Sequence, residues 1–409
     1  MAKERIVTGI DIGASKIRCL IGKKNNQGKF DIIGCGVIPH NYIKKGAVAD
    51  LKGLSDAIGK AVYKAEDESG KKVQSAYINA ADQHTEGIWS NSEIVISDRD
   101  SEITRFDTEK VTKDAKSISI PYEREIFYTV HNGYTVDDEK GIVDPAGTFG
   151  FKLRADLYLI TVKAALIENL KKAVLQTGIS VAGTVISSVP TSLSCLSQHE
   201  KKIGTVLIDM GADLTEISIY TEGLLRYIKI LPTGGNEMTD KISHQFRLPL
   251  EVAEKVKTEE IALDEEYADD DKIILKVDSR QRVIYKKELQ ALLQDLYKNM
   301  FISIKEAANK SGIFRDASNG VVLTGGASVM EGAAEIAEIE FGCPVRVGHI
   351  TQLGTSSQPL VAHIFATAVG LVKYGFKEAE KRKNIIEKGT KNAFASIIDY
   401  ARSLYREYF

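Results

Sequence analysis

The chain has 409 residues, of which 43% are hydrophobic and 27% are charged. This length is too great for one hydrophobic core and suits two domains, and the composition is typical of a folded, soluble protein rather than a disordered or fibrous one. The net charge is −2 and the sequence contains no long basic block, so we expect no nucleic-acid partner.

The four cysteines are far apart and form no Cys-x-x-Cys pair, which is typical of free thiols in a reducing compartment. The seven histidines show no metal-binding spacing, so no transition-metal site is expected. The first residues run into a predicted strand without an apolar leader. The most apolar run, Leu360–Val372, is shorter than the ~20 residues that cross a bilayer, and it predicts a buried helix.

The first 80 residues predict the order strand, strand, strand, helix, strand. Alternating apolar residues indicate the strands, and apolar residues three or four apart indicate the helix. The predicted strands are Arg5–Ile12, Lys16–Gly22, Phe30–Ile38 and Lys72–Ala80, and the predicted helix is Leu51–Ala65.

The stretch from Asp82 to Tyr158 differs in character because it is rich in charged residues and turns. It predicts strands at Ser92–Ser97 and Glu125–Asn132 and a helix at Asp107–Ile118. We interpret it as a small separate module inserted between two parts of the first domain. The elements predicted after it are a strand at Leu159–Val162, a helix at Ala165–Thr177, a strand at Ser180–Val189 and a helix at Thr191–Gln198.

The second half begins with an apolar strand that ends at Asp209, followed by an alternating strand, Thr215–Tyr220. The acidic stretch Leu263–Lys272 lacks the spacing of a calcium-binding loop and predicts a solvated loop. The other predicted elements are helices at Asn236–Phe246, Leu250–Glu259, Lys287–Gly312 and Met330–Phe341 and short strands at Val321–Leu323 and Val345–Val347.

One motif occurs in both halves: Ile10-Asp11-Ile12-Gly13-Ala14 matches Ile208-Asp209-Met210-Gly211-Ala212. Each copy predicts a strand, a carboxylate at its end, a tight turn of small residues and a second strand. Small residues let a phosphate approach the backbone, and successive N–H groups form an anion-binding concavity. Two such turns could hold a polyphosphate from opposite sides, with a hydrated Mg²⁺ between Asp11 and Asp209.

Two glycine pairs, Gly234-Gly235 and Gly325-Gly326, each precede a predicted helix and could enclose a nucleoside. Either pair alone is better explained as a structural turn, but the four features in this order favour nucleotide binding. The predicted nucleotide-binding residues are Asp11, Gly13, Ala14, Ser15, Lys16, Asp209, Gly211, Ala212, Asp213, Gly234, Gly235, Asn236, Gly325, Gly326, Ala327 and Ser328.

The order of these motifs resembles that of the actin–hexokinase–DnaK superfamily, and the chain is similar to the FtsA family of bacterial cell-division proteins over roughly Arg5–Gly375. The matching segments are Gly9–Gly22 for the first phosphate loop, Arg124–Leu153 for the inserted subdomain that distinguishes this family, Leu231–Ser243 and Val321–Gly332 for the nucleoside-side loops, and His363–Gly375 for the closing helix.

The resemblance implies an actin-like α/β ATPase fold, with two duplicated domains around a nucleotide cleft and an FtsA-type inserted subdomain. The implied ranges are domain I at 1–82 and 159–202, the inserted subdomain at 83–158, domain II at 203–358, a closing helix of domain I at 359–376, a charged linker at 377–391 and an amphipathic membrane-targeting helix at 392–409.

The resemblance also implies a function: the protein binds ATP and Mg²⁺, polymerises into actin-like filaments and anchors the FtsZ ring. It would be a peripheral protein on the cytoplasmic face of the cell membrane at the division site, and it would recruit later division proteins. Analogy places the FtsZ surface on the lobe after Asn236, at Lys286 and Lys287. The alternatives are a PilM-like assembly protein of type IV pili and an active ATPase of the same superfamily.

Two departures from the family pattern affect catalysis. The family's second phosphate loop reads Asp-x-Gly-Gly-Gly-Thr-Thr, whereas here Ala212 restricts the backbone and Asp213 adds a negative charge. At ~4 Å and an effective dielectric of 20, that charge would repel a phosphate charge by about 4 kcal/mol unless Mg²⁺ or an outward rotation relieves it. In addition, Val189 stands before Pro190, where the family has a water-orienting Glu. We therefore expect weak or conditional nucleotide binding and little or no hydrolysis, since losing a general base costs about 10²–10⁴ in rate.

The last 18 residues, 392–409, carry apolar and aromatic side chains at helical spacing. Such a face suits either a helix in the bilayer interface or a helix that docks on the body or on a partner, and the pattern alone does not decide between them. The family carries a C-terminal amphipathic anchor, which favours the membrane. The predicted membrane-binding residues are Phe394, Ile397, Ile398, Ala401, Leu404, Tyr405 and Tyr408.

Overall fold

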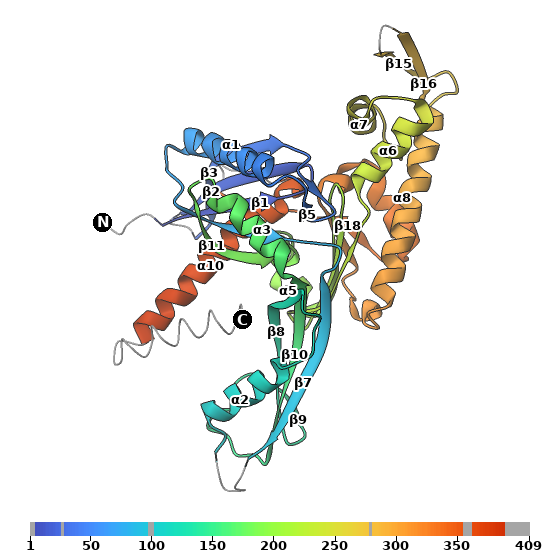
Figure 1. The fold of residues 1–409 in the computed structure, drawn as a ribbon. Coiled ribbons are helices and arrows are strands. Elements are labelled where there is room, and N and C mark those ends of the chain that lie inside the picture. Colours follow the sequence, from blue (N-terminus) through green and yellow to red (C-terminus); the bar gives the residue numbers. More distant parts are fainter. Residues whose placement is uncertain (1–4, 26–27, 97–101, 278–279, 355–361, 389–409) are drawn as a thin grey trace.

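We describe the protein from a computed structural model, over residues 5–25, 28–96, 102–277, 280–354 and 362–388. Two α/β halves lie side by side, and an elongated unit projects from the region where they meet (Figure 1). Each half is built on its own sheet.

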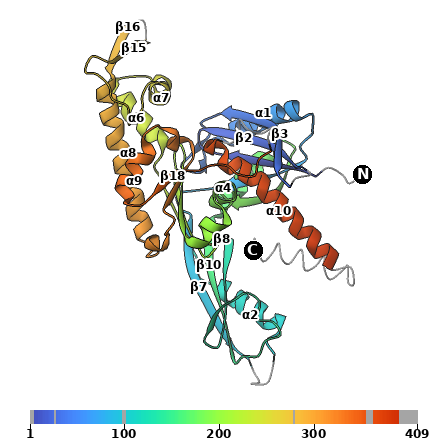
Figure 2. The same cartoon turned by 180° about the vertical axis from the view of Figure 1, so that it is seen from behind.

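The first half contains a five-stranded sheet in the order β11-β6-β1-β2-β3. Strands β1, β2 and β3 are antiparallel because short turns join them, whereas β6 and β11 run parallel to β1 because each follows a helix. Helices α1 and α3 pack on one face of this sheet, and α4 and α10 cover the other face (Figure 2).

The bounds in the first half are β1 Ile6–Ile12, β2 Lys16–Lys24, β3 Phe30–Pro39, β4 Ile43–Lys44, β5 Ala47–Val48, α1 Leu51–Ser69, β6 Ser75–Ala80, α3 Ala164–Leu175, β11 Ser180–Ile186, α4 Ser188–Cys195, α5 Gln198–Ile203, η4 His363–Phe365 and α10 Ala366–Lys388. Helix α1 illustrates the local signals: Asp50 accepts the Gly53 N–H at its start, and Gly70 ends it in the left-handed conformation.

The second half contributes five strands to a nine-stranded sheet, in the order β18-β17-β12-β13-β14. Helices α6 to α9 share a hydrophobic core with this part of the sheet. The bounds are β12 Thr205–Met210, β13 Thr215–Thr221, β14 Leu224–Leu231, α6 Gly235–Phe246, α7 Leu250–Glu259, β15 Lys272–Val277, β16 Arg280–Tyr285, α8 Lys286–Asn309, η1 Phe314–Asp316, β17 Val321–Thr324, η2 Gly326–Val329, α9 Ala333–Phe341 and β18 Val345–Val347.

The remaining four strands of this sheet form the projecting unit, in the order β7-β10-β8-β9 (Figure 1). Its elements are β7 Glu86–Val95, α2 Arg105–Lys116, β8 Arg124–Val136, β9 Glu139–Ile142 and β10 Lys152–Lys163, and α2 packs on the sheet through buried Val111 and Ala115. Strand β7 pairs with β14 through Glu86 and Lys229. The predicted inserted module is therefore present with a hydrophobic core of its own, and its strands also continue the sheet of the second half.

Three differences concern the extent of elements. Strand β10 crosses the predicted boundary between 158 and 159: its burial alternates up to Leu157, and every residue from Leu157 to Val162 is buried. Helix α10 continues to Lys388, through most of the predicted linker. The β15–β16 hairpin is not predicted by the sequence, because its strands are short and carry many charges. No helix in the described ranges is long and apolar enough to cross a bilayer.

Candidate functional site

The two copies of the repeated motif form the same structure. Residues 13–15, between β1 and β2, are the first loop, and residues 211–214, between β12 and β13, are the second loop. The Gly13 N–H donates to the Lys16 carbonyl at 3.2 Å, and the Gly211 N–H donates to the Leu214 carbonyl at 2.9 Å. The next two N–H groups of each loop make no hydrogen bond to another described residue. Such free, neighbouring N–H groups are what an anion-binding loop requires.

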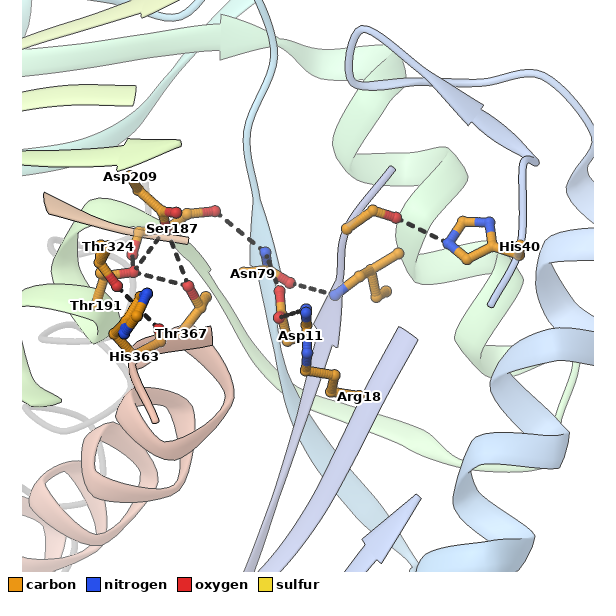
Figure 3. A network of polar contacts seen from close by, with 12 residues as sticks. Asp11, Arg18, His40, Asn79, Ser187, Thr191, Asp209, Thr324, His363 and Thr367 are labelled. Carbon is orange, nitrogen blue, oxygen red and sulfur yellow. Dashed lines mark hydrogen bonds and ion pairs between the residues drawn. The ribbon is translucent and has the colours of Figure 1, made fainter. Parts of the chain in front are cut away.

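The first loop is supported by His40. The imidazole Nε2 lies 2.8 Å from the Gly13 carbonyl (Figure 3). Its Nδ1 accepts the Tyr42 N–H at 3.1 Å. Since Nδ1 accepts, Nε2 carries the proton and donates to Gly13. Burial lowers the pKa of His40, which favours this neutral form. His40 therefore holds the loop through the Gly13 carbonyl, and the loop's N–H groups remain free to bind an anion.

Asp11 is buried near the end of β1, beside the first loop. Its carboxylate forms an ion pair with Arg18 at 3.1 Å and accepts a hydrogen bond from Asn79 Nδ2 at 3.0 Å (Figure 3). Asn79 is fixed in turn because its Oδ1 accepts the Ile12 N–H at 2.7 Å. Burial raises the pKa of Asp11, and Arg18 and Asn79 oppose that shift.

Asp209 occupies the equivalent position in the second half. Its Oδ2 accepts hydrogen bonds from Thr367 at 3.2 Å and from Thr191 at 3.4 Å, so residues of α10 and α4 orient it (Figure 3). Burial and the charge of Asp11 raise the pKa of Asp209 to about 6. The two predicted metal ligands thus come from different halves and are close enough to repel each other.

Helix α6 holds the second loop. The N–H groups of Gly235 and Asn236 donate to the carbonyls of Gly211 and Ala212, at 3.0 and 2.8 Å. The first glycine pair therefore positions the second loop directly. Lys257, which is buried, ties α7 to the same turn by donating to the Gly235 carbonyl at 2.9 Å.

The second glycine pair lies against Asp209. Gly325 has a φ of +90°, and a Cβ placed on it would lie 2.4 Å from Asp209 Oδ1. The following residues continue into η2, where the Ala327 carbonyl accepts the Tyr297 hydroxyl at 2.7 Å. A Cβ on Gly235 would lie 3.4 Å from that of Ala327, so the two glycine pairs are neighbours.

The structure thus brings together Asp209, the second loop and both glycine pairs, and it places Asp11 near Asp209. Lys16 is exposed, and its charge acts on Glu254 and Lys257 of α7 in the other half. Lys286 and Lys287 lie elsewhere, at the start of α8 (Figure 1); the first stacks over Tyr267 and the second pairs with Asp269. The predicted membrane-binding residues lie outside the described ranges.

Several residues of this site are not predicted by the sequence. Asn79 and the two threonines contact the carboxylates from distant segments, whereas Arg18 lies opposite Asp11 in the β1–β2 hairpin. Glu254 and Lys257 carry a weak local signal, since a spacing of three residues on a predicted helix brings them together; their side chains pair at 2.6 Å. Glu216 is the most important site residue that the sequence does not predict. It is the cross-strand neighbour of Asp209, and neither of its carboxyl oxygens has a hydrogen-bond partner among the described residues.

The residues fit Mg²⁺ bound together with a nucleotide. Mg²⁺ is usually held by one or two carboxylates together with substrate phosphates and water. Asp11 and Asp209 supply two carboxylates whose mutual repulsion a cation would relieve. Among the described residues, no group of three or more His, Cys, Asp and Glu side chains could hold a metal ion by itself. Water and phosphate oxygens would supply the other ligands of a bound Mg²⁺.

A family model described as cell division protein FtsA matches residues 206–370, and a model described as the SHS2 domain inserted in FtsA matches residues 82–161. The cell division protein FtsA of Neisseria meningitidis is 30% identical over 374 residues, which cover 90% of each chain. Among solved structures, a PilM–PilN type IV pilus biogenesis complex matches with a TM-score of 0.64 and 15% identity, over 90% of this chain and 98% of that one. MreB5 of Spiroplasma citri bound to AMPPNP matches with a TM-score of 0.55 and 12% identity, over 94% and 99%.

These likenesses and the paired loops define an actin-like α/β protein that carries an inserted SHS2 domain. The predicted fold class is thereby confirmed. Within that class, the chain belongs to the FtsA family of cell-division proteins, which confirms the resemblance in the sequence.

Proposed function

We propose that the protein binds ATP with Mg²⁺ between its two halves, forms actin-like filaments and anchors the FtsZ ring to the cytoplasmic face of the membrane at the division site, where later division proteins join it. The observation that carries the nucleotide part is the pairing of two equivalent loops with Asp11 and Asp209. The ATP analogue in the similar MreB5 structure supports the same placement. The site residues predicted from the sequence belong to this proposal, and so do the predicted domain ranges, apart from the 158/159 boundary that β10 crosses and the linker that α10 enters.

We further propose that hydrolysis is weak or absent. Val189 is half-buried among apolar side chains at the position where the family pattern has Glu, so no carboxylate of that residue can orient water. Phosphate release at a rate typical of an active ATPase, on the order of 1 s⁻¹ or faster, would contradict this part of the proposal.

The nucleotide proposal predicts a Mg²⁺-dependent affinity that requires Asp209. Removing Mg²⁺ should weaken binding of a fluorescent ATP analogue at least about tenfold in the wild type, since the metal bridges phosphate and carboxylate. The variant Asp209→Asn should lose most of this difference. A titration with and without Mg²⁺ measures both, and Asp138→Asn, an exposed aspartate of the inserted subdomain, is the control. Equal affinity with and without the metal would argue against the proposed Mg²⁺ site.

The membrane part of the proposal predicts that removing residues 392–409 releases the protein from anionic liposomes in a sedimentation assay. The variant Ile398→Glu, on the predicted apolar face, should weaken binding by placing a charge in the interface, whereas Asp399→Asn should retain it. Unchanged sedimentation after the deletion would refute the anchor.

The FtsZ surface is proposed at Lys286 and Lys287. Retention of the protein on immobilised FtsZ would support the FtsA-like function over the PilM-like alternative. Filament formation is supported only by the fold.

A further inference from the structure

A contact between the two halves involves Asp213 of the second loop. Its Oδ2 accepts the backbone N–H of Lys45, in the first half, at 3.1 Å. Its Oδ1 accepts the side-chain Nδ2 of Asn236, at the start of α6, at 2.7 Å. Asp213, which is absent from the family's loop pattern, therefore accepts hydrogen bonds from both halves.

On the first half, the donor lies in a rigid turn. Lys45 and Gly46 form the two-residue turn of the β4–β5 hairpin, with φ of +49° and +87°. Gly46 is pressed against the end of β6, since a Cβ on it would lie 2.5 Å from the Ala81 carbonyl. The hairpin therefore moves with the first half.

On the second half, the acceptor is equally fixed. The Asn236 N–H binds the Ala212 carbonyl, and its side chain binds Asp213, so α6 holds the loop at two successive residues. The Asp213 carboxylate cannot follow the hairpin when the halves separate, because its loop is tied to α6. A relative movement of the halves must lengthen the bond to Lys45.

The bond lies beside the proposed phosphate site and is one of several links between the halves. Thr191 and Thr367 contact Asp209, and an apolar cluster joins Tyr220 and Leu225 to the helices of the first half. We expect a polyphosphate that enters between the two loops to push them apart. Both donors to Asp213 are neutral, so its negative charge also disfavours an incoming nucleotide.

We propose that Asp213, the Lys45 N–H and Asn236 form a clasp that holds the two halves together over the nucleotide site and limits the rate at which nucleotide enters and leaves. The clasp regulates the site assigned above and rests on that proposed function. It acts on both rates, because the same bond must break for entry and for release; the charge of Asp213 acts separately, on affinity.

The clasp itself is tested by hydrogen–deuterium exchange of the Lys45 amide in the full chain without nucleotide. Asp213→Ala removes the acceptor and should raise the exchange rate of this amide about fivefold or more. Asp213→Asn loses the charge but keeps a carbonyl oxygen for the Lys45 N–H, so it should stay close to the wild type. Lys45→Asn is the matched control, because it keeps the backbone donor and tolerates the left-handed conformation. Unchanged exchange in Asp213→Ala would overturn the proposal.

The regulation is tested by stopped-flow binding and release of a fluorescent ATP analogue with Mg²⁺. Asp213→Ala should raise both rates about threefold or more, whereas Asp213→Asn should chiefly raise affinity, and Lys45→Asn should match the wild type. Faster amide exchange without any change in either nucleotide rate would show a structural contact only and would overturn the regulation. If no variant binds the analogue, the proposed function itself fails, while the Lys45 amide still reports whether the clasp exists.

Discussion

We expect the ionisation of Glu216 to lower the free energy of unfolding of the wild type by about 4 kcal/mol between pH 5 and pH 9, and we expect the variant Glu216→Gln to lack this loss. The side chain is 5% exposed, and burial together with the charge of Asp209 raises its pKa to about 8. In the unfolded chain the same carboxyl titrates near 4.5. Between these two values the unfolded state releases the proton and the folded state keeps it, so the free energy of unfolding falls as the pH rises through this window.

The prediction is measured by urea unfolding of the wild type and of Glu216→Gln at pH 5 and pH 9, without nucleotide or Mg²⁺. The substituted glutamine side chain has a burial cost of its own, but that cost is the same at both pH values. Comparing how much the free energy of unfolding changes from pH 5 to pH 9 in the two proteins therefore isolates the effect of the Glu216 carboxyl. Glu139→Gln, at an exposed position of β9, is the control and should follow the wild type. Parallel pH profiles for Glu216→Gln and the wild type would show that Glu216 titrates normally.

The raised pKa also bears on the proposed metal site. With this raised pKa, the Glu216 carboxyl is mostly protonated at neutral pH. Asp209 on β12 therefore faces a neutral side chain across the pair that β12 forms with β13. A cation bound between Asp11 and Asp209 would favour the ionised form of Glu216, since an opposite charge nearby lowers the pKa of a carboxyl.

The substitution Gly325→Ala is expected to cost on the order of 2–4 kcal/mol of stability and to abolish nucleotide binding, whereas Gly326→Ala should leave the stability nearly unchanged. Gly325 has a left-handed φ of +90°, and its added Cβ would lie 2.4 Å from Asp209 Oδ1 and 2.5 Å from the Met210 carbonyl. The methyl group must therefore displace the carboxylate that the proposed function requires.

Gly326 is the matched control because it is the adjacent glycine. An added Cβ there meets no atom within 4 Å, and its φ is not in the left-handed region. Its substitution should change stability by less than about 1 kcal/mol, since alanine chiefly restricts the unfolded chain. Chemical denaturation compares the stability of the two variants, and the ATP-analogue titration measures the nucleotide affinity of Gly325→Ala. Equal losses of stability would mean that the close approach at Gly325 is not what matters.

Much of the fold follows from the sequence because its signals are local. Strands β1, β2 and β3 alternate, and helix α1 has its apolar residues three and four apart with a cap at each end. The repeated Asp-x-Gly-Ala motif predicts both loops, since a tight turn needs small residues at fixed positions. These features depend on neighbours a few residues away, which the sequence displays directly.

The sequence by itself therefore determined the two halves, the twin loops and the two aspartates that accompany them. Only the tertiary structure decided what those groups touch. Asn79 reaches Asp11, Glu216 becomes a buried neighbour of Asp209, β7 joins β14 instead of forming a sheet of its own, and Asp213 binds Lys45 across the two halves. The reason is physical: burial and long-range hydrogen bonding are set by how the elements pack, and for residues far apart in the chain the sequence separation does not say whether they meet.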